Sequence, residues 1–338
     1  MRGTHSRGPS RGGPVGKEPG THPRETHAPR GSGLALAALI SGAVGIACAP
    51  IFVRLSELGP TATAFWRLAL ALPVVWLWTE VGRRRETTPA PRLSGRRTFL
   101  GLVLAGLFFA GDLALWHWSI GFTSVANSTL LVNLAPVFVA LGGRLLFGER
   151  FAYTFLVGMA VALAGAALLV GGDLGLGARQ LFGDVLAVLA ALFYAGYILS
   201  VSRLRSTLST AAVMTYVGVV TCAVLLPVAI LSGEDLLATT LFGWMMLAGI
   251  ALVSQIGGQS MITYALADLP AAFSSVALLL QPVAAALLAW AILGEALGWW
   301  QALGGAVVLA GIVLARRGSQ RSVGDEQHGF SSTHQDPV

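Results

Sequence analysis

The stretch SVANSTLLVNLAPVFVALGGRLLFGE, at 124–149, decides how this chain is organised. It begins with small and polar residues, continues as an apolar run and ends on Gly148-Glu149. Pro136 interrupts the apolar run. A proline inside a helix removes one backbone hydrogen bond and leaves the carbonyl four residues earlier without its partner. The stretch therefore predicts an apolar helix with a local irregularity near its centre.

The same arrangement occurs a second time, at 270–295, in PAAFSSVALLLQPVAAALLAWAILGE. Pro282 follows Pro136, and Gly294 follows Gly148, at one constant offset of 146 residues. The offset continues without a gap into the next apolar run, where Gly158, Ala160, Val161, Leu163, Ala164 and Gly165 recur as Gly304, Ala306, Val307, Leu309, Ala310 and Gly311. A register of this length indicates that the chain is a duplication.

The composition indicates a membrane protein. Apolar residues make up 55% of the chain, charged residues only 11%, and the mean hydropathy is +0.72. A soluble domain of this length needs more charge to cover its surface. Cys48 and Cys222 lie inside apolar runs, so neither a disulfide framework nor a metal site is indicated. The net charge of +6 resides mainly in arginines of the tails and of alternate short loops, which predicts a lipid bilayer rather than a nucleic acid as partner.

Ten apolar runs are long enough to cross a bilayer core of about 30 Å, which takes about 20 helical residues. The runs are continuously apolar instead of alternating, so helices rather than barrel strands are expected. The expected spans lie near 33–53, 61–81, 98–118, 125–147, 153–172, 182–202, 210–231, 240–264, 270–292 and 297–315. The fold class is therefore an all-α integral membrane protein with ten transmembrane helices.

The arginine distribution predicts the orientation of these helices. With the N-terminus in the cytoplasm, the outside receives only Arg54 and Arg179. The inside then receives the basic tail, the six arginines between 83 and 97, and Arg144, Arg150, Arg203, Arg205, Arg316, Arg317 and Arg321. Basic residues accumulate in cytoplasmic loops. We therefore expect a multi-pass protein of the inner (plasma) membrane with both termini cytoplasmic.

Ten spans and two copies of the duplicated unit give five helices in each repeat. Because five is odd, the second repeat enters the membrane with opposite polarity, which gives two inverted five-helix repeats. The first repeat is expected at 33–172 and the second at 182–317, between disordered tails at 1–32 and 318–338. Carriers built in this way place their substrate site near mid-bilayer, between the repeats.

Two tandem units with a small-residue start, a central proline and a Gly-Glu end resemble EamA-type carriers of the drug/metabolite transporter superfamily. The second span adds PTATAFWRLALA, at 60–71, which is similar to the family's Pro…Phe-x-Arg start of that helix and contains Arg67. The resemblance covers about 30–317. It implies a carrier of small metabolites, commonly an exporter, of monomer or homodimer size and without a bound cofactor. The seventh span, which begins STAAVMTYVGVV, has no arginine equivalent to Arg67.

Three ionisable residues are expected inside the membrane. Arg67 and Asp112 lie at similar depths of neighbouring spans, and we expect them to pair or to face one cavity, because an isolated charge there costs about 2.5–3.5 kcal/mol. The alternative is that Arg67 extends to the outer interface while Asp112 caps or is hydrated locally. His117 is a candidate proton relay beside Asp112, although an interfacial histidine between Trp116 and Trp118 needs no such role.

Polar side chains at mid-depth are the candidate substrate-binding residues. Asn133 and Gln281 each precede a proline, so the neighbouring carbonyls of Val132 and Leu278 are also available to a ligand. The further candidates, besides Arg67, are Tyr194, Tyr197, Gln255 and Gln259. The alternative for the amides is that they hold helices together, at about 1 kcal/mol each.

Other patterns have structural interpretations. Glu149 and Glu295 are expected to be turn residues at helix ends rather than catalytic carboxylates, and the Gly/Ala run at 158–167 and its repeat at 304–311 are expected to pack helices closely. The leading hypothesis is a secondary transporter of small metabolites or drug-like compounds, acting by alternating access. Alternatives are an intramembrane hydrolytic enzyme, disfavoured because His117 is the sole histidine inside a span, and a receptor or scaffold, disfavoured because no soluble domain is indicated.

Overall fold

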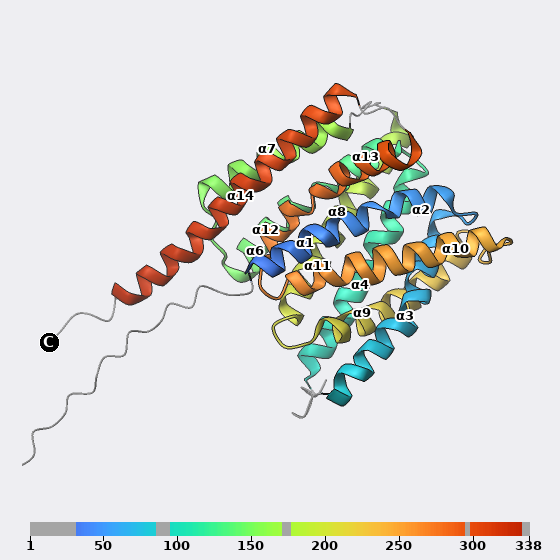
Figure 1. Cartoon of the computed structure of the whole chain (residues 1–338), viewed down its shortest axis with the longest axis horizontal. Coiled ribbons are helices and arrows are strands. Elements are labelled where there is room, and N and C mark those ends of the chain that lie inside the picture. Colours follow the sequence, from blue (N-terminus) through green and yellow to red (C-terminus); the bar gives the residue numbers. More distant parts are fainter. Residues whose placement is uncertain (1–31, 86–94, 171–176, 295–297, 333–338) are drawn as a thin grey trace, which may run out of the picture. The chain divides into compact units, whose positions relative to one another are not determined.

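A computed structural model describes residues 32–85, 95–170, 177–294 and 298–332 (Figure 1). Two expected features lie outside these residues. They are the disordered tail at 1–32, apart from Ser32, and residues 86–94 of the basic loop. In the described part the secondary structure is helical, and no strand occurs. The all-α fold class is therefore confirmed.

The first half of the chain forms five membrane-spanning units from seven helices. Two of the units are interrupted, so each consists of two helices. In chain order the helices are α1 (Ser32–Ala47), α2 (Ala49–Leu55), α3 (Pro60–Arg85), α4 (Arg96–Ile120), α5 (Val125–Val132), α6 (Ala135–Phe147) and α7 (Tyr153–Val170).

The second half repeats this pattern. Its elements are α8 (Ala178–Leu204), α9 (Thr210–Leu231), α10 (Leu241–Gly249), the π-helix η1 (Ile250–Gln259), α11 (Ser260–Ala265), α12 (Ala271–Ala277), α13 (Leu280–Leu293) and α14 (Trp299–Ser332). In the described residues nine helical stretches are long and apolar enough to cross a membrane, and Tyr153–Leu169 is a tenth, shorter apolar helix. These stretches correspond to the ten expected spans.

The interruptions recur at equivalent places in the two halves. Asn133 and Leu134 separate α5 from α6, and Leu278 and Leu279 separate α12 from α13. Pro136 and Pro282 lie in the first turn of the helices that follow, where a missing N–H group is tolerated. The prolines thus divide each span into two short helices, as the sequence predicts.

The helix ends also repeat. Gly148 and Gly294 have φ angles of 69° and 68°, a left-handed conformation that glycine adopts without a steric penalty. The N–H groups of Gly148 and Glu149 donate to the carbonyls of Arg144 and Gly143, at 3.0 and 3.1 Å, and close the end of α6. The interpretation of Gly148-Glu149 as a turn is confirmed, whereas Glu295 lies outside the described residues.

Helices α7 and α14 pack backbone against backbone (Figure 1). A methyl group on Gly158 would lie 2.3 Å from the nitrogen of Ala315, and one on Gly165 would lie 2.5 Å from that of Val308. Later residues of one helix therefore contact earlier residues of the other, so the helices are antiparallel. The close packing expected for the Gly/Ala run is confirmed.

The contact is also reciprocal. Gly304, the counterpart of Gly158, would place a methyl group 2.6 Å from the nitrogen of Leu169, and Gly311, the counterpart of Gly165, would place one 2.4 Å from that of Ala162. Each helix thus uses the same surface toward its equivalent, which is the property of a two-fold contact. Because equivalent helices run antiparallel, the two repeats are inverted.

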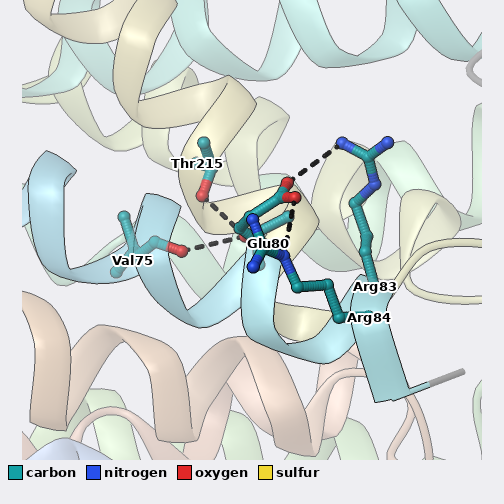
Figure 2. A network of polar contacts seen from close by, with 6 residues as sticks. Val75, Glu80, Arg83, Arg84 and Thr215 are labelled. Carbon is teal, nitrogen blue, oxygen red and sulfur yellow. Dashed lines mark hydrogen bonds and ion pairs between the residues drawn. The ribbon is translucent and has the colours of Figure 1, made fainter.

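Other helices obey the same pseudo-symmetry. Helix α4 packs on α8, and its counterpart, formed by η1 and α11, packs on α1, where Gly42, Gly45 and Gly258 let the backbones approach. Helix α3 packs on its own counterpart α9, and the hydroxyls of Thr79 and Thr215 lie 2.9 Å apart. Figure 2 shows Thr215 near the end of α3 at which Glu80 contacts Arg83 and Arg84.

Two glutamates connect the loop before α3 with the loop before α10. Glu234 accepts hydrogen bonds from the N–H groups of Thr61 and Ala62, in the first turn of α3. Glu57 accepts hydrogen bonds from the N–H groups of Thr239 and Thr240 and from both hydroxyls, at the start of α10. The loop before α10 therefore places Glu234 at the positive N-terminal end of α3, and the loop before α3 places Glu57 at that of α10.

Helix α14 extends further than expected. A disordered tail is expected from 318, but the helix continues to Ser332. Gly318 lies against α7, since a methyl group there would be 2.2 Å from the nitrogen of Phe155. Packing on α7 therefore continues past 315, where the sequence predicts the span to end, and no proline occurs in α14 to end the helix earlier.

Replacing Gly165 by leucine should destabilise the protein strongly. The new side chain would meet the backbone of Val308 and Gly304, which cannot move aside as a flexible side chain can. We expect a loss of about 3 kcal/mol, or a Tm several degrees lower in detergent. The control is Gly82→Leu in α3. A Cβ atom added to Gly82 would have no neighbouring atom within 4 Å. Equal Tm values for the two variants would contradict the close packing.

Replacing Glu57 by glutamine should lower the Tm at neutral pH. Its hydrogen bonds, first that with the Thr240 side chain, hold the Glu57 pKa below its usual value. A lowered pKa stabilises the folded state above the usual glutamate pKa, and this contribution is lost as the pH falls through the lowered value. The difference in Tm between the two proteins should therefore disappear at acid pH. Asp235→Asn, which changes an exposed carboxylate of the partner loop, is the control.

Candidate functional site

A cavity of about 200 Å³ lies between the two halves of the chain. Its wall is formed by α1, α2, α3, α4 and α5 of the first half and by α8, η1 and α13 of the second. Its lining combines apolar side chains with six of the nine residues that the sequence predicts for the site: Arg67, Asp112, Asn133, Tyr194, Gln259 and Gln281. Six helical units thus bring together residues that are up to 214 positions apart.

Arg67 extends from α3 into this cavity and is almost completely buried, with 8% of its surface exposed. Its Nε atom donates a hydrogen bond of 2.9 Å to the Oε1 atom of Gln255, on η1. Gln255 does not line the cavity, contrary to the prediction. Its side chain instead accepts the hydrogen bond from Arg67. The side-chain amide of Gln255, from the second half, therefore orients the guanidinium of Arg67, from the first half.

Asp112 lines the same cavity from α4 and is equally buried. The expectation that Arg67 and Asp112 face one cavity is met, but the direct ion pair is not formed: among the contacts of the described residues, none joins the two side chains. A cavity that admits water or a ligand hydrates each charge, so a direct contact is not required. The site therefore holds one basic and one acidic side chain that share a cavity without a direct hydrogen bond or salt bridge between them.

Tyr197 supports the wall rather than lining the cavity, which also differs from the prediction. Its ring is stacked on that of Phe109, with centroids 4.6 Å apart, and its hydroxyl accepts a hydrogen bond of 2.9 Å from Nε2 of Gln259. Phe109 and Gln259 both line the cavity. Tyr197 therefore fixes two lining side chains that come from different halves. Tyr194, one turn earlier on α8, reaches the cavity itself.

Asn133 and Gln281 lie at the two helix interruptions and both line the cavity. The amide nitrogens of both are buried, and neither has a hydrogen-bond partner among the described residues. The carbonyl of Leu278, expected to be unpartnered, accepts a hydrogen bond of 2.9 Å from the N–H group of Gln281. The donors that the interruptions present to the cavity are therefore the two side-chain amides.

His117 does not line the main cavity. It borders a second cavity of about 30 Å³, which it shares with Arg67 and Trp116. Its side chain is buried, with 7% exposed, and its ring lies 4.9 Å from that of Trp116. Although it was expected close to the outer interface, it is enclosed by protein next to the guanidinium of Arg67.

The structure adds lining residues that sequence reasoning missed. Pro50 and Ala49 reach the cavity because the first span is interrupted at Cys48, between α1 and α2. The proline was visible in the sequence, and the rule that predicts the breaks at Pro136 and Pro282 applies to it equally. Phe109 and Trp116 on α4 were missed because an apolar wall residue cannot be distinguished by type from a lipid-facing one.

Within the described ranges, no group of three or more His, Cys, Asp or Glu side chains is placed to hold a metal ion. Cys48 and Cys222 are both free thiols. The polar side chains that line the cavity are those of Arg67 and Asp112, three amides, the Tyr194 phenol and the Thr129 hydroxyl, which can bind a solute by hydrogen bonds and charge. Two inverted repeats that enclose such a cavity near interrupted helices form the architecture of secondary transporters.

Comparison with known proteins gives the family. The model of the EamA-like transporter family matches residues 30–171 and 181–317, one match for each repeat. The chain therefore belongs to the EamA-like transporter family and is a multi-pass membrane protein.

Individual relatives agree with this assignment. Two Archaeoglobus fulgidus proteins named "Uncharacterized transporter" are each 26% identical to the chain, over 78% and 83% of it and over 91% and 96% of their own lengths. A Streptantibioticus cattleyicolor protein named "Probable terminal-alkyne amino-acid exporter" is 28% identical over 60% of the chain and 68% of its own length. A solved crystal structure with 18% identity shares the fold, with a TM-score of 0.69 over 86% of this chain and 98% of that one.

Replacing Gln259 by methionine should destabilise the protein, whereas replacing Asn133 by leucine should not. The first change removes a hydrogen-bond donor to the buried Tyr197 hydroxyl, at a cost of about 1–3 kcal/mol. The second removes an amide whose nitrogen has no protein partner in the described contacts, and should cost less than about 0.5 kcal/mol. Thermal unfolding in detergent measures both. A loss for Asn133→Leu as large as that for Gln259→Met would mean that Asn133 holds helices together.

Proposed function

We propose that the chain is a secondary transporter that exports small zwitterionic metabolites of the amino-acid class by alternating access. The observation that carries the proposal is the presence of Arg67 and Asp112 in one buried cavity without an ion pair between them. A zwitterion supplies a carboxylate for the guanidinium and an ammonium group for the carboxylate. Each buried charge then gains a partner when the solute binds.

The size of the cavity favours a small metabolite over a drug-like compound. At about 200 Å³ it is smaller than the roughly 300–1,000 Å³ of sites for drug-sized ligands. The unpaired amide nitrogens of Asn133 and Gln281 are available as donors to the carboxylate or to a polar side chain of the solute. The relative named as an amino-acid exporter supports the same class of solute.

The symmetry of the fold supports alternating access. The cavity lies between inverted repeats, and the helices that line it on both sides are interrupted at equivalent places. The glycine contact between α7 and α14 joins the repeats through a two-fold surface, along which one repeat can rock against the other. In this mechanism Gln255 orients Arg67, and Tyr197 positions Phe109 and Gln259.

Asp112 and His117 are the proposed groups for proton coupling. Asp112 is in the cavity, and His117 lies beside Arg67 in the adjoining smaller cavity, so a proton on either group changes the charge that a bound solute meets. The arginine distribution supports a plasma-membrane protein with both termini in the cytoplasm. A hydrolytic enzyme is a weaker proposal, since the relatives described above bear the names of transporters and an exporter.

Transport by proteoliposomes tests the proposal. Purified protein should take up one or more radiolabelled neutral amino acids from a panel that also contains nucleosides and cationic drugs, with and without a pH gradient. Arg67→Gln and Asp112→Asn should each reduce the apparent affinity by at least about tenfold, because each removes one charge partner of a zwitterion.

Two controls make this experiment decisive. Arg150→Gln removes an exposed arginine outside the cavity and should leave transport unchanged. Amine and carboxylate analogues of a transported amino acid identify the partner of each residue, because the amine should be insensitive to Arg67→Gln and the carboxylic acid to Asp112→Asn. Uptake of cationic drugs alone, unaffected by Arg67→Gln, would contradict the proposed substrate class.

A further inference from the structure

A groove of about 450 Å³ lies between α4, α6 and α8, and two of these helices, α4 and α8, also form the cavity wall. Leu104, Leu146 and Phe147 line it and expose much of their surface, which in a membrane-spanning chain faces lipid. Gly101 and Gly196 also line it. The groove is therefore an apolar channel open to the acyl chains of the bilayer.

The groove has the length of one leaflet. It begins at Arg97, in the first turn of α4, and reaches Phe108, eleven residues further along the same helix. At about 1.5 Å per helical residue, this distance is about 16 Å. Half of a bilayer core of about 30 Å is about 15 Å. One end of the groove therefore lies at the membrane interface and the other near the bilayer centre.

The interfacial end is positively charged. Arg97 and Arg203 both line the groove there, at the start of α4 and the end of α8. Among the described contacts neither arginine has a carboxylate partner, and the guanidinium of Arg203 lies 3.7 Å from the ring centroid of Phe147. Arg83 and Arg84, at the same end of the bundle, differ because both contact Glu80 (Figure 2).

We infer that this groove binds an anionic phospholipid of the leaflet that contacts the arginine-rich end of the bundle. The two arginines bind the phosphate, and the apolar walls pack against one acyl chain. Basic pockets between transmembrane helices bind anionic head groups in this way. A zwitterionic lipid such as phosphatidylcholine satisfies the arginines less well, because its own ammonium group opposes them.

The bound lipid contacts the side of the cavity wall that faces away from the cavity. Phe108 lines the groove and the next residue, Phe109, lines the cavity. On α8, Gly196 lines the groove and Tyr197 stacks on Phe109. The same pair of helices thus separates the lipid from the solute, so occupancy of the groove supports the packing of this wall.

The experiment measures lipid binding by the purified full chain and does not depend on transport. Native mass spectrometry and thermal unfolding are followed during titration with dioleoyl-phosphatidylglycerol or dioleoyl-phosphatidylcholine. The wild type should bind phosphatidylglycerol preferentially and gain Tm. Arg97→Gln with Arg203→Gln should weaken phosphatidylglycerol binding by about 30-fold, as expected from the loss of two interfacial arginine contacts.

The matched control is Arg83→Gln with Arg84→Gln, which removes the same charge from the same end of the bundle but outside the groove. It should retain phosphatidylglycerol binding within about threefold of the wild type. A second variant, Leu104→Trp, fills the groove while both arginines remain, and should also displace the lipid. Equal losses in the two arginine variants, equal binding of phosphatidylcholine, or the same Tm gain with inorganic phosphate alone would overturn the inference.

Discussion

The contact between α7 and α14 is the constraint on which the rest of the structure depends. Two copies of one sequence meet through the same surface, so the residues of that surface must fit their own counterparts. Gly158, Gly165, Gly304 and Gly311 meet this requirement by removing the side chain where the backbones touch. In a bilayer, where hydrophobic burial does not drive helices together, such close packing is a main source of association. It fixes the inverted arrangement, and hence where the two halves face each other.

The pseudo-symmetry of the two halves does not extend to the polar residues at the cavity between them. Arg67 has no arginine counterpart in the second half, and Gln255, which holds it, lies on the π-helix η1, whereas the equivalent segment of the first half lies in the α-helix α4. A π-helix segment shifts the following side chains relative to a regular helix and often occurs at functional sites. The two repeats therefore form a pseudo-symmetric fold around an asymmetric set of polar groups.

Several features could be predicted because they depend on local sequence. The ten spans follow from hydropathy, the breaks before α6 and α13 from Pro136 and Pro282, and the close packing of α7 on α14 from recurring glycines. The roles of Gln255 and Tyr197 could not be predicted in the same way. A polar residue in an apolar span is expected to avoid lipid, but the sequence does not tell whether it meets a cavity or another side chain.

What the sequence by itself determined is the duplication, the number of spans and which residues are too polar to face lipid. These properties follow from the periodicity and transfer free energy of each segment taken alone. Only the tertiary structure decided which polar groups pair with one another. Arg67 bonds to Gln255, from a helix 188 residues away, and not to Asp112 on the neighbouring helix. The reason is geometric, because the partner of a buried charge depends on how helices from both repeats are rotated and placed around one cavity.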